Sequence, residues 1–206
     1  SAFLRDPALR PEAEALFHSA HIVVGNAEEA AAIAELNGWP AVAEASTKGD
    51  STATTSWLEA TASHLAQKLL ASASQKCDFK AVVFTDGSLG AAAAVARWEG
   101  DGESTAVRTV CVREPVPPLP PPGFVVDTNG AGDAFVGGMC SALVAAVASP
   151  EVAGTSAAAM ASHFLGSAEH VRHILAVGHR AAGYVVQQRG CRIPAVPCTI
   201  VCTPPA

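Results

Sequence analysis

One short segment of the chain places a carboxylate directly after a glycine-rich turn: Asp127-Thr128-Asn129-Gly130-Ala131-Gly132-Asp133. Glycines keep side chains out of the way of an approaching anion, and the backbone N–H groups that open a helix carry partial positive charge. These residue types and this spacing indicate a phosphate site with Asp133 in the first helical turn. A base at that position could take a proton from a hydroxyl that attacks phosphorus, so the predicted chemistry is phosphoryl transfer.

The hydrophobic period changes on the two sides of this turn. Residues 123–126 form a short apolar run that ends in two β-branched residues, which predicts a buried strand. The apolar residues after Ala131 follow helical spacing instead and predict a helix over residues 130–147. The segment is therefore expected to be a strand, a turn and a helix in succession. Short glycine motifs also match by chance, and the alternative is a plain turn with a capping aspartate.

The heptad closely resembles the signature of the ribokinase-like carbohydrate and nucleoside kinases. The resemblance implies that Asp133 is the catalytic base and that the backbone of Gly130, Ala131 and Gly132 forms the anion hole. It also implies ATP as co-substrate and Mg²⁺ as cofactor.

A second stretch, residues 21–30, resembles the strand of this family that ends in an N-x-x-E motif. The resemblance implies that Asn26 and Glu29 organise magnesium and phosphate through water, in keeping with the preference of Mg²⁺ for oxygen ligands and retained waters. The residues alone predict equally that Asn26 caps a helix over Ala27–Leu36 and that Glu29 completes a capping box. Both roles can hold at once.

A third stretch, residues 81–87, is an apolar strand that runs into a small turn and resembles the ATP-phosphate loop of the family. The resemblance implies that Thr85 and Gly87 face the nucleotide and that Asn129 helps to cradle it. A hairpin with an Asp-Gly turn, in which residues 91–97 form the return strand, would show the same pattern.

Within the family, residues 176–182 and 189–194 are most similar to adenosine kinases, and so are the Gly25-Asn26 pair and the residues after Asp133. This implies transfer of the γ-phosphate of ATP to the 5'-hydroxyl of adenosine, with His179 lining the adenine pocket. The alternative for His179 is a half-buried helical histidine without a role. The alternatives for the whole chain are another sugar kinase of the family and an inactive nucleotide-binding fragment.

The resemblance covers nearly all 206 residues but corresponds only to the C-terminal part of such an enzyme. We therefore expect residues 1–206 to be the C-terminal part of a kinase domain whose N-terminal strands and lid are missing. Two insertions, around residues 46–56 and 149–167, have the Ala, Ser, Thr and Gly content of loops or a short extra helix.

Composition limits the possible partners. With 13 Lys and Arg against 19 Asp and Glu, the chain has a formal charge of -6, which disfavours nucleic acid. Its apolar stretches are too short or too interrupted to span a bilayer. The six cysteines form no C-x-x-C pair and are expected to be free thiols in a reducing compartment. We expect a monomer of the cytoplasm, with the nucleus as a second location.

Alternating strands and helices predict an α/β fold, a Rossmann-like parallel sheet of the ribokinase type with helices on both faces. Because ligands bind at the carboxyl ends of such strands, the loops at Asn26, Thr85 and Asp127 are expected to gather at one edge. Helices are predicted over residues 7–20, 27–36, 57–73, 130–147, 156–165 and 169–188, and strands over residues 21–24, 80–85, 91–98, 105–112 and 123–126.

Overall fold

A computed structural model describes residues 6, 8–39, 51–73, 77–99, 106–119, 121, 123–148 and 165–190, with the backbone alone for residues 51–56. The chain divides into two compact units, Ser1–Arg113 and Glu114–Ala206, and each is taken by itself below. The predicted short helix at residues 156–165, the insertion at residues 149–167 and the last three cysteines lie almost wholly outside the described residues.

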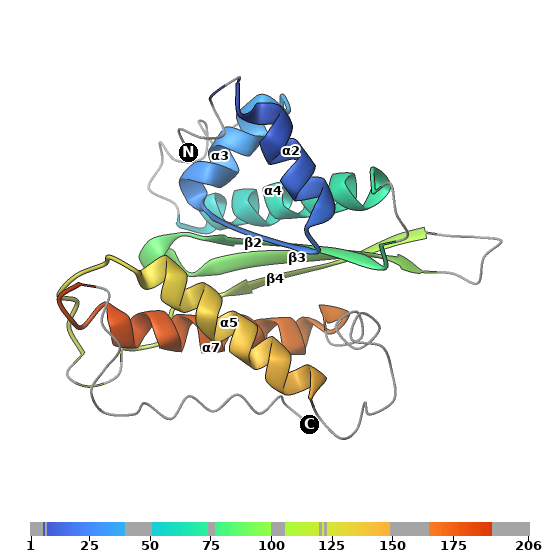
Figure 1. The fold of residues 1–206 in the computed structure, drawn as a ribbon. Helices are drawn as coiled ribbons and strands as arrows, with labels where there is room; N and C mark the ends of the chain where they lie inside the picture. The colour runs from blue at the N-terminus through green and yellow to red at the C-terminus, as the bar shows by residue number, and fades with distance from the viewer. Residues whose placement is uncertain are drawn as a thin grey trace. The chain divides into compact units, whose positions relative to one another are not determined.

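The first unit is built on a sheet with the spatial order β1-β2-β3-β4 (Figure 1). The strands are β1 (Ile22–Asn26), β2 (Phe79–Thr85), β3 (Ala91–Glu99) and β4 (Ala106–Glu114). The expected parallel pairing is confirmed for β1 and β2, but β3 runs antiparallel to β2, so the sheet is mixed. The connection between β2 and β3 is too short for the crossover that a parallel pair requires.

Three helices lie on one face of this sheet: α2 (Arg10–Ser19), α3 (Ala27–Leu36) and α4 (Ser51–Ala71) (Figure 1). The helices α3 and α4 lie in the crossover between the parallel strands β1 and β2. The helix α4 begins at Ser51, earlier than the predicted start at Trp57, so helix occupies part of the predicted insertion at residues 46–56.

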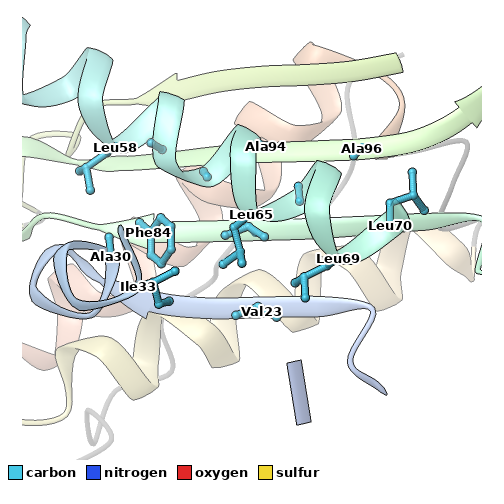
Figure 2. Packing of buried hydrophobic residues seen from close by; sticks show 14 of the residues in the cluster. Val23, Ala30, Ile33, Leu58, Leu65, Leu69, Leu70, Phe84, Ala94 and Ala96 are labelled. Atoms are coloured by element: carbon cyan, nitrogen blue, oxygen red, sulfur yellow. The ribbon is translucent and has the colours of Figure 1, made fainter. Parts of the chain in front are cut away.

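The core of the first unit lies between α4 and the sheet. Leucines on α4 face strands that carry mostly alanine and valine, and these large and small side chains fill the layer together (Figure 2). Their spacing along α4 is helical, as the apolar pattern predicts. The buried α4 residues in this layer are Leu58, Ala62, Leu65, Ala66, Leu69 and Leu70.

A buried lysine joins α2 to the sheet. Lys80 on β2 is only 2% exposed, and its ammonium group donates hydrogen bonds to the carbonyl oxygens of His18 at 2.7 Å and Ala20 at 2.6 Å. The His18 carbonyl lies in the last turn of α2 and the Ala20 carbonyl in its C-cap residue, where the helix dipole is negative and carbonyls lack intrahelical partners. The cation therefore stabilises the end of the helix and fixes it to β2.

The second unit contains α5 (Ala131–Val147) packed against α7 (Ala168–Val185). The two backbones approach closely at Gly138 and Gly178. A Cβ atom at Gly138 would lie 2.7 Å from Ala181 Cβ, and one at Gly178 would lie 2.9 Å from the ring of Phe135. Only glycine fits at this crossing without displacing a neighbour.

The predicted buried strand at residues 123–126 is wrong. Phe124 and Val125 are each 56% exposed, and no strand pairs with this segment within the described residues. The backbone N–H groups of Val126 and Asp127 instead donate to Val186 O, at 2.7 and 3.0 Å, at the end of α7. A short apolar run has the composition of a buried strand whether or not another strand lies beside it.

None of the helices in the described ranges has the length and apolar character that a membrane crossing requires.

Candidate active site

The first group of candidate residues lies where β1 and β2 end. Asn26 and Thr85 are the last residues of these strands and stand opposite each other in the parallel register. Their predicted placement at one sheet edge is therefore confirmed. The third loop predicted there, at Asp127, follows no strand and belongs to the second unit.

Asn26 and Glu29 form the predicted capping box at the start of α3. The Asn26 Oδ1 atom accepts a hydrogen bond from the Glu29 backbone N–H at 2.9 Å, and the Glu29 Oε2 atom accepts one from the Asn26 N–H at 2.8 Å. Gly25 makes room for this carboxylate, because a Cβ atom there would lie 2.9 Å from Glu29 Oε2. The local capping role of both residues is thus confirmed.

The donor set at this edge suits water-mediated contact with a hard cation. The second carboxylate oxygen of Glu29 has no hydrogen bond to any described residue, and the Asn26 amide oxygen keeps a second lone pair. Across the described ranges, no three His, Cys, Asp or Glu side chains cluster closely enough to hold a metal by themselves. Magnesium commonly binds through few protein groups and retains its waters, so these residues fit that ion.

Thr85 and Gly87 lie in the turn between β2 and β3, and the hairpin alternative is confirmed. The Asp86 N–H donates to Gly90 O at 2.8 Å, and a short 3-10 helix, η3 (Gly87–Leu89), fills the turn. Thr85 Oγ1 lies 3.4 Å from Gly25 O, which links the ends of the two parallel strands. Gly87 is exposed, and a Cβ atom there would have no neighbour within 4 Å.

The second group lies at the start of α5, whose N-cap is Gly130. Gly130 has φ 77° and ψ 1°, a left-handed conformation that favours glycine, and it supplies no side-chain cap. The Ala131 N–H donates to Thr128 O at 3.2 Å, so this N–H already has a partner within the loop. The N–H groups of Gly132 and Asp133 have no hydrogen-bond partner among the described residues.

Space and charge at this helix start suit an anion. A Cβ atom on Gly132 would meet nothing within 4 Å, so the approach to the open N–H groups is clear. The Asp133 side chain is exposed in the first turn and has no hydrogen bond or ion pair with a described residue. Such a carboxylate can accept a proton from a hydroxyl placed beside it.

The structure gives Asp127 a role at the site that the sequence did not reveal. Its Oδ1 atom accepts a hydrogen bond from the Asn129 N–H at 3.0 Å, and its Oδ2 atom accepts one from the Gly190 N–H at 2.8 Å. These two backbone hydrogen bonds lower the pKa of the Asp127 carboxyl from its usual value of 3.8, and the bond from Asn129 has the larger effect. The side chain thereby connects the loop before α5 to the residues after α7. An aspartate that accepts a hydrogen bond from the backbone N–H two residues later is a known turn motif. This motif is the feature of the sequence that could have indicated the role of Asp127.

His179 is a buried residue of α7. The residue is 6% exposed, its Nε2 atom lies 3.2 Å from Glu114 O, and its ring centroid lies 5.0 Å from that of Phe135. Burial lowers the pKa of this imidazole, which keeps it neutral near pH 7. A contact with adenine stays a prediction.

The structure therefore groups the candidate residues by unit. Asn26, Glu29, Thr85 and Gly87 belong to the first unit, at the ends of β1 and β2. The loop and helix start from Asn129 to Asp133, together with His179, belong to the second unit.

Comparison with known proteins gives the family. The model of the pfkB family carbohydrate kinases matches residues 2–198, and this match spans both units. No curated protein matches the sequence. The chain belongs to the pfkB family of carbohydrate kinases, which are ATP-dependent phosphotransferases.

Proposed function

We propose that this kinase phosphorylates the 5'-hydroxyl of adenosine, with ATP as the phosphate donor and AMP as the product. The observation that carries the phosphoryl-transfer part is the start of α5. There, two N–H groups without partners among the described residues open onto clear space beside the Asp133 carboxylate. An anion site with an adjacent base is the minimum that phosphoryl transfer to a hydroxyl needs.

In the proposed reaction Asp133 takes the proton of the acceptor hydroxyl as its oxygen attacks the γ-phosphorus. The N–H groups of Gly132 and Asp133 stabilise negative charge that develops on the phosphate oxygens, with the positive end of the α5 dipole behind them. Asp127 is a positioning residue, because it holds Asn129 and the loop through backbone bonds rather than touching the phosphate.

The edge formed by β1 and β2 is proposed to hold the nucleotide phosphates and their metal. Thr85 and Gly87 would face ATP, and Asn26 and Glu29 would hold magnesium through water. The support is that Glu29 keeps one carboxylate oxygen without a partner among the described residues and that Gly87 is exposed with space around it. The ion would neutralise phosphate charge during transfer.

The choice of adenosine rests on residues 176–182 and 189–194, on the Gly25-Asn26 pair and on the segment after Asp133. His179 is proposed to border the adenine. A sugar such as ribose or fructose is the second candidate, because the family match is to carbohydrate kinases. We further propose that residues 1–206 are the C-terminal part of the kinase domain and that the protein is a monomer of the cytoplasm, with the nucleus as a second location.

The test is an acceptor panel on the full-length protein with γ-labelled ATP and Mg²⁺. Equal concentrations of adenosine, ribose and fructose are compared by kcat/KM, and binding of a non-hydrolysable ATP analogue to the same protein is measured by calorimetry. Label in AMP, with the sugars at least about tenfold poorer, supports the proposal. If a sugar is preferred over adenosine, the sugar and not adenosine is the acceptor. If the analogue binds but no phosphate is transferred, the protein is a nucleotide-binding module and not a kinase.

A further inference from the structure

A pocket of about 280 Å³ lies in the first unit and is lined by α2, α3 and α4. Its α3 residues come from the last part of that helix, including Ile33 and Leu36, whereas the candidate magnesium residues Asn26 and Glu29 open the helix. A helix of this length spans about 15 Å, so the pocket and the phosphate edge are separate places.

The inner wall of the pocket is apolar and firmly packed. Ala13, Ile33, Leu65 and Leu69 line it, and each is 5% exposed or less because each also belongs to the core. Ile33, Leu65 and Leu69 lie in the layer between the helices and the sheet (Figure 2). Phe17 adds an aromatic ring to the lining. This wall suits a flat apolar group.

The rim of the pocket carries an excess of positive charge. Arg10 is paired with Glu14 at 3.0 Å, so these two charges offset each other. Lys68 also lines the pocket, but its ammonium group donates to the neutral amide oxygen of Asn37 and has no carboxylate partner among the described residues. The lining therefore holds two cationic side chains and one carboxylate from Arg10, Lys68 and Glu14, which leaves one positive charge unmatched.

We propose that this pocket binds a small amphipathic monoanion, with an aromatic body of one or two rings and a single carboxylate. The rings would lie against the apolar wall, and the carboxylate would lie at Lys68. A nucleoside triphosphate carries too much negative charge for one unmatched cation. The volume is also just below the usual range for small-molecule pockets, which suits a compact ligand.

The test uses the full chain and two probes of the same shape, naphthoate and its neutral amide, naphthamide. Calorimetric titration should show binding of both, with naphthoate about two- to fivefold tighter, the scale of an exposed charge pair. Equal affinities would overturn the role of charge, and no binding of either probe would overturn the site.

Two rim variants and a control locate the binding. Lys68→Met should weaken naphthoate to the level of naphthamide and leave naphthamide unchanged, whereas Glu14→Gln should tighten naphthoate alone. Arg108→Gln on β4 removes a cation that pairs with Glu99 and does not line the pocket, so it should change neither affinity. Unchanged naphthoate affinity in Lys68→Met, with thermal unfolding as in the parent protein, would contradict the proposal.

A wall variant tests the apolar part. Ala13→Leu adds volume inside the pocket and should abolish binding of both probes, and circular dichroism checks that α2 still forms. Persistent binding in a folded Ala13→Leu protein would place the probes elsewhere. If that variant does not fold, Leu36→Phe can replace it. Leu36 lines the pocket from α3 and is only partly buried, so the larger ring should narrow the pocket and abolish binding of both probes.

Discussion

The helices α3 and α5 both begin beside a candidate phosphate site, yet their first turns are completed in opposite ways. The start of α3 is closed by its own side chains, since Asn26 and Glu29 bond reciprocally to each other's backbone N–H groups. The start of α5 has Gly130 as its N-cap, without a side chain to accept, and two N–H groups have no partner in the described ranges. The N3 N–H of α3 therefore has an acceptor from its own cap, whereas the N3 N–H of α5, that of Asp133, gains one only when an anion binds.

This difference separates stability from binding at the two sites. Removing a side chain from the α3 start should weaken the fold, because backbone groups lose their partners. Adding a side chain at the α5 start should leave the fold intact and block the ligand, because the added atoms enter empty space. The residues at the α3 start are thus expected to affect the stability of the unliganded protein, and those at the α5 start are expected to affect the affinity for the ligand.

The strongest effect is expected from Asp133→Asn. Loss of the base should lower kcat of the full-length protein by about a hundredfold or more while leaving binding of an ATP analogue nearly unchanged. The control is Asp78→Asn, an exposed aspartate before β2, which should keep the parent rate. Near-normal turnover in Asp133→Asn would remove Asp133 from the reaction.

The next effect tests the space in front of α5. Gly132→Val should weaken binding of the ATP analogue about tenfold or more, since its branched side chain would occupy the approach to the N–H groups. Gly137→Val makes the same chemical change later on the same helix, where a Cβ atom also meets nothing within 4 Å. Equal affinities in the two variants would mean that the α5 start binds no phosphate.

A smaller effect is expected at the α3 start. Asn26→Ala should lower the free energy of unfolding by about 1 kcal/mol, the usual cost of losing an N-cap, as measured by urea titration. Asn26→Ser restores a cap and should recover that stability. If Asn26→Ser also recovers full magnesium-dependent analogue binding, the amide has no part in holding the ion, and the contrast between α3 and α5 becomes sharper.

The smallest effect concerns pH and the loop before α5. Because the folded-state pKa of Asp127 is below its usual 3.8, the carboxylate stabilises the folded form above that value, and this contribution disappears as pH falls through the lowered pKa. Urea midpoints measured downward from about pH 6 should therefore fall less steeply in acid for Asp127→Asn than for the parent protein. Identical pH profiles would show that Asp127 does not carry this contribution.

Features that depend on neighbouring residues were predictable from the sequence. The capping box, the hairpin after Thr85 and the helix that opens at Gly130 each depend on side chains within about one turn. The parallel pairing of β1 and β2 followed from the helices between them, because such a connection requires a crossover.

Features that depend on contacts between distant residues were missed or wrong. Residues 123–126 have the composition of a buried strand, but the backbone after them bonds to Val186 at the end of α7, which local pattern does not reveal. The bond of Asp127 to Gly190 and the close approach of Gly138 to Gly178 are of the same kind. Site residues could be named from motifs, but the occupied N–H of Ala131 required coordinates.

The buried ammonium group of Lys80 makes this residue a natural reporter of global opening. Trypsin cleaves after a lysine only when several flanking residues become extended and accessible, and here the side chain is bonded inside the unit while β2 lies between two other strands. Local fraying of α2 would free the carbonyls but leave the strand paired. A tryptic cut after Lys80 therefore requires the sheet itself to open, and its rate would report how often the first unit unfolds as a whole.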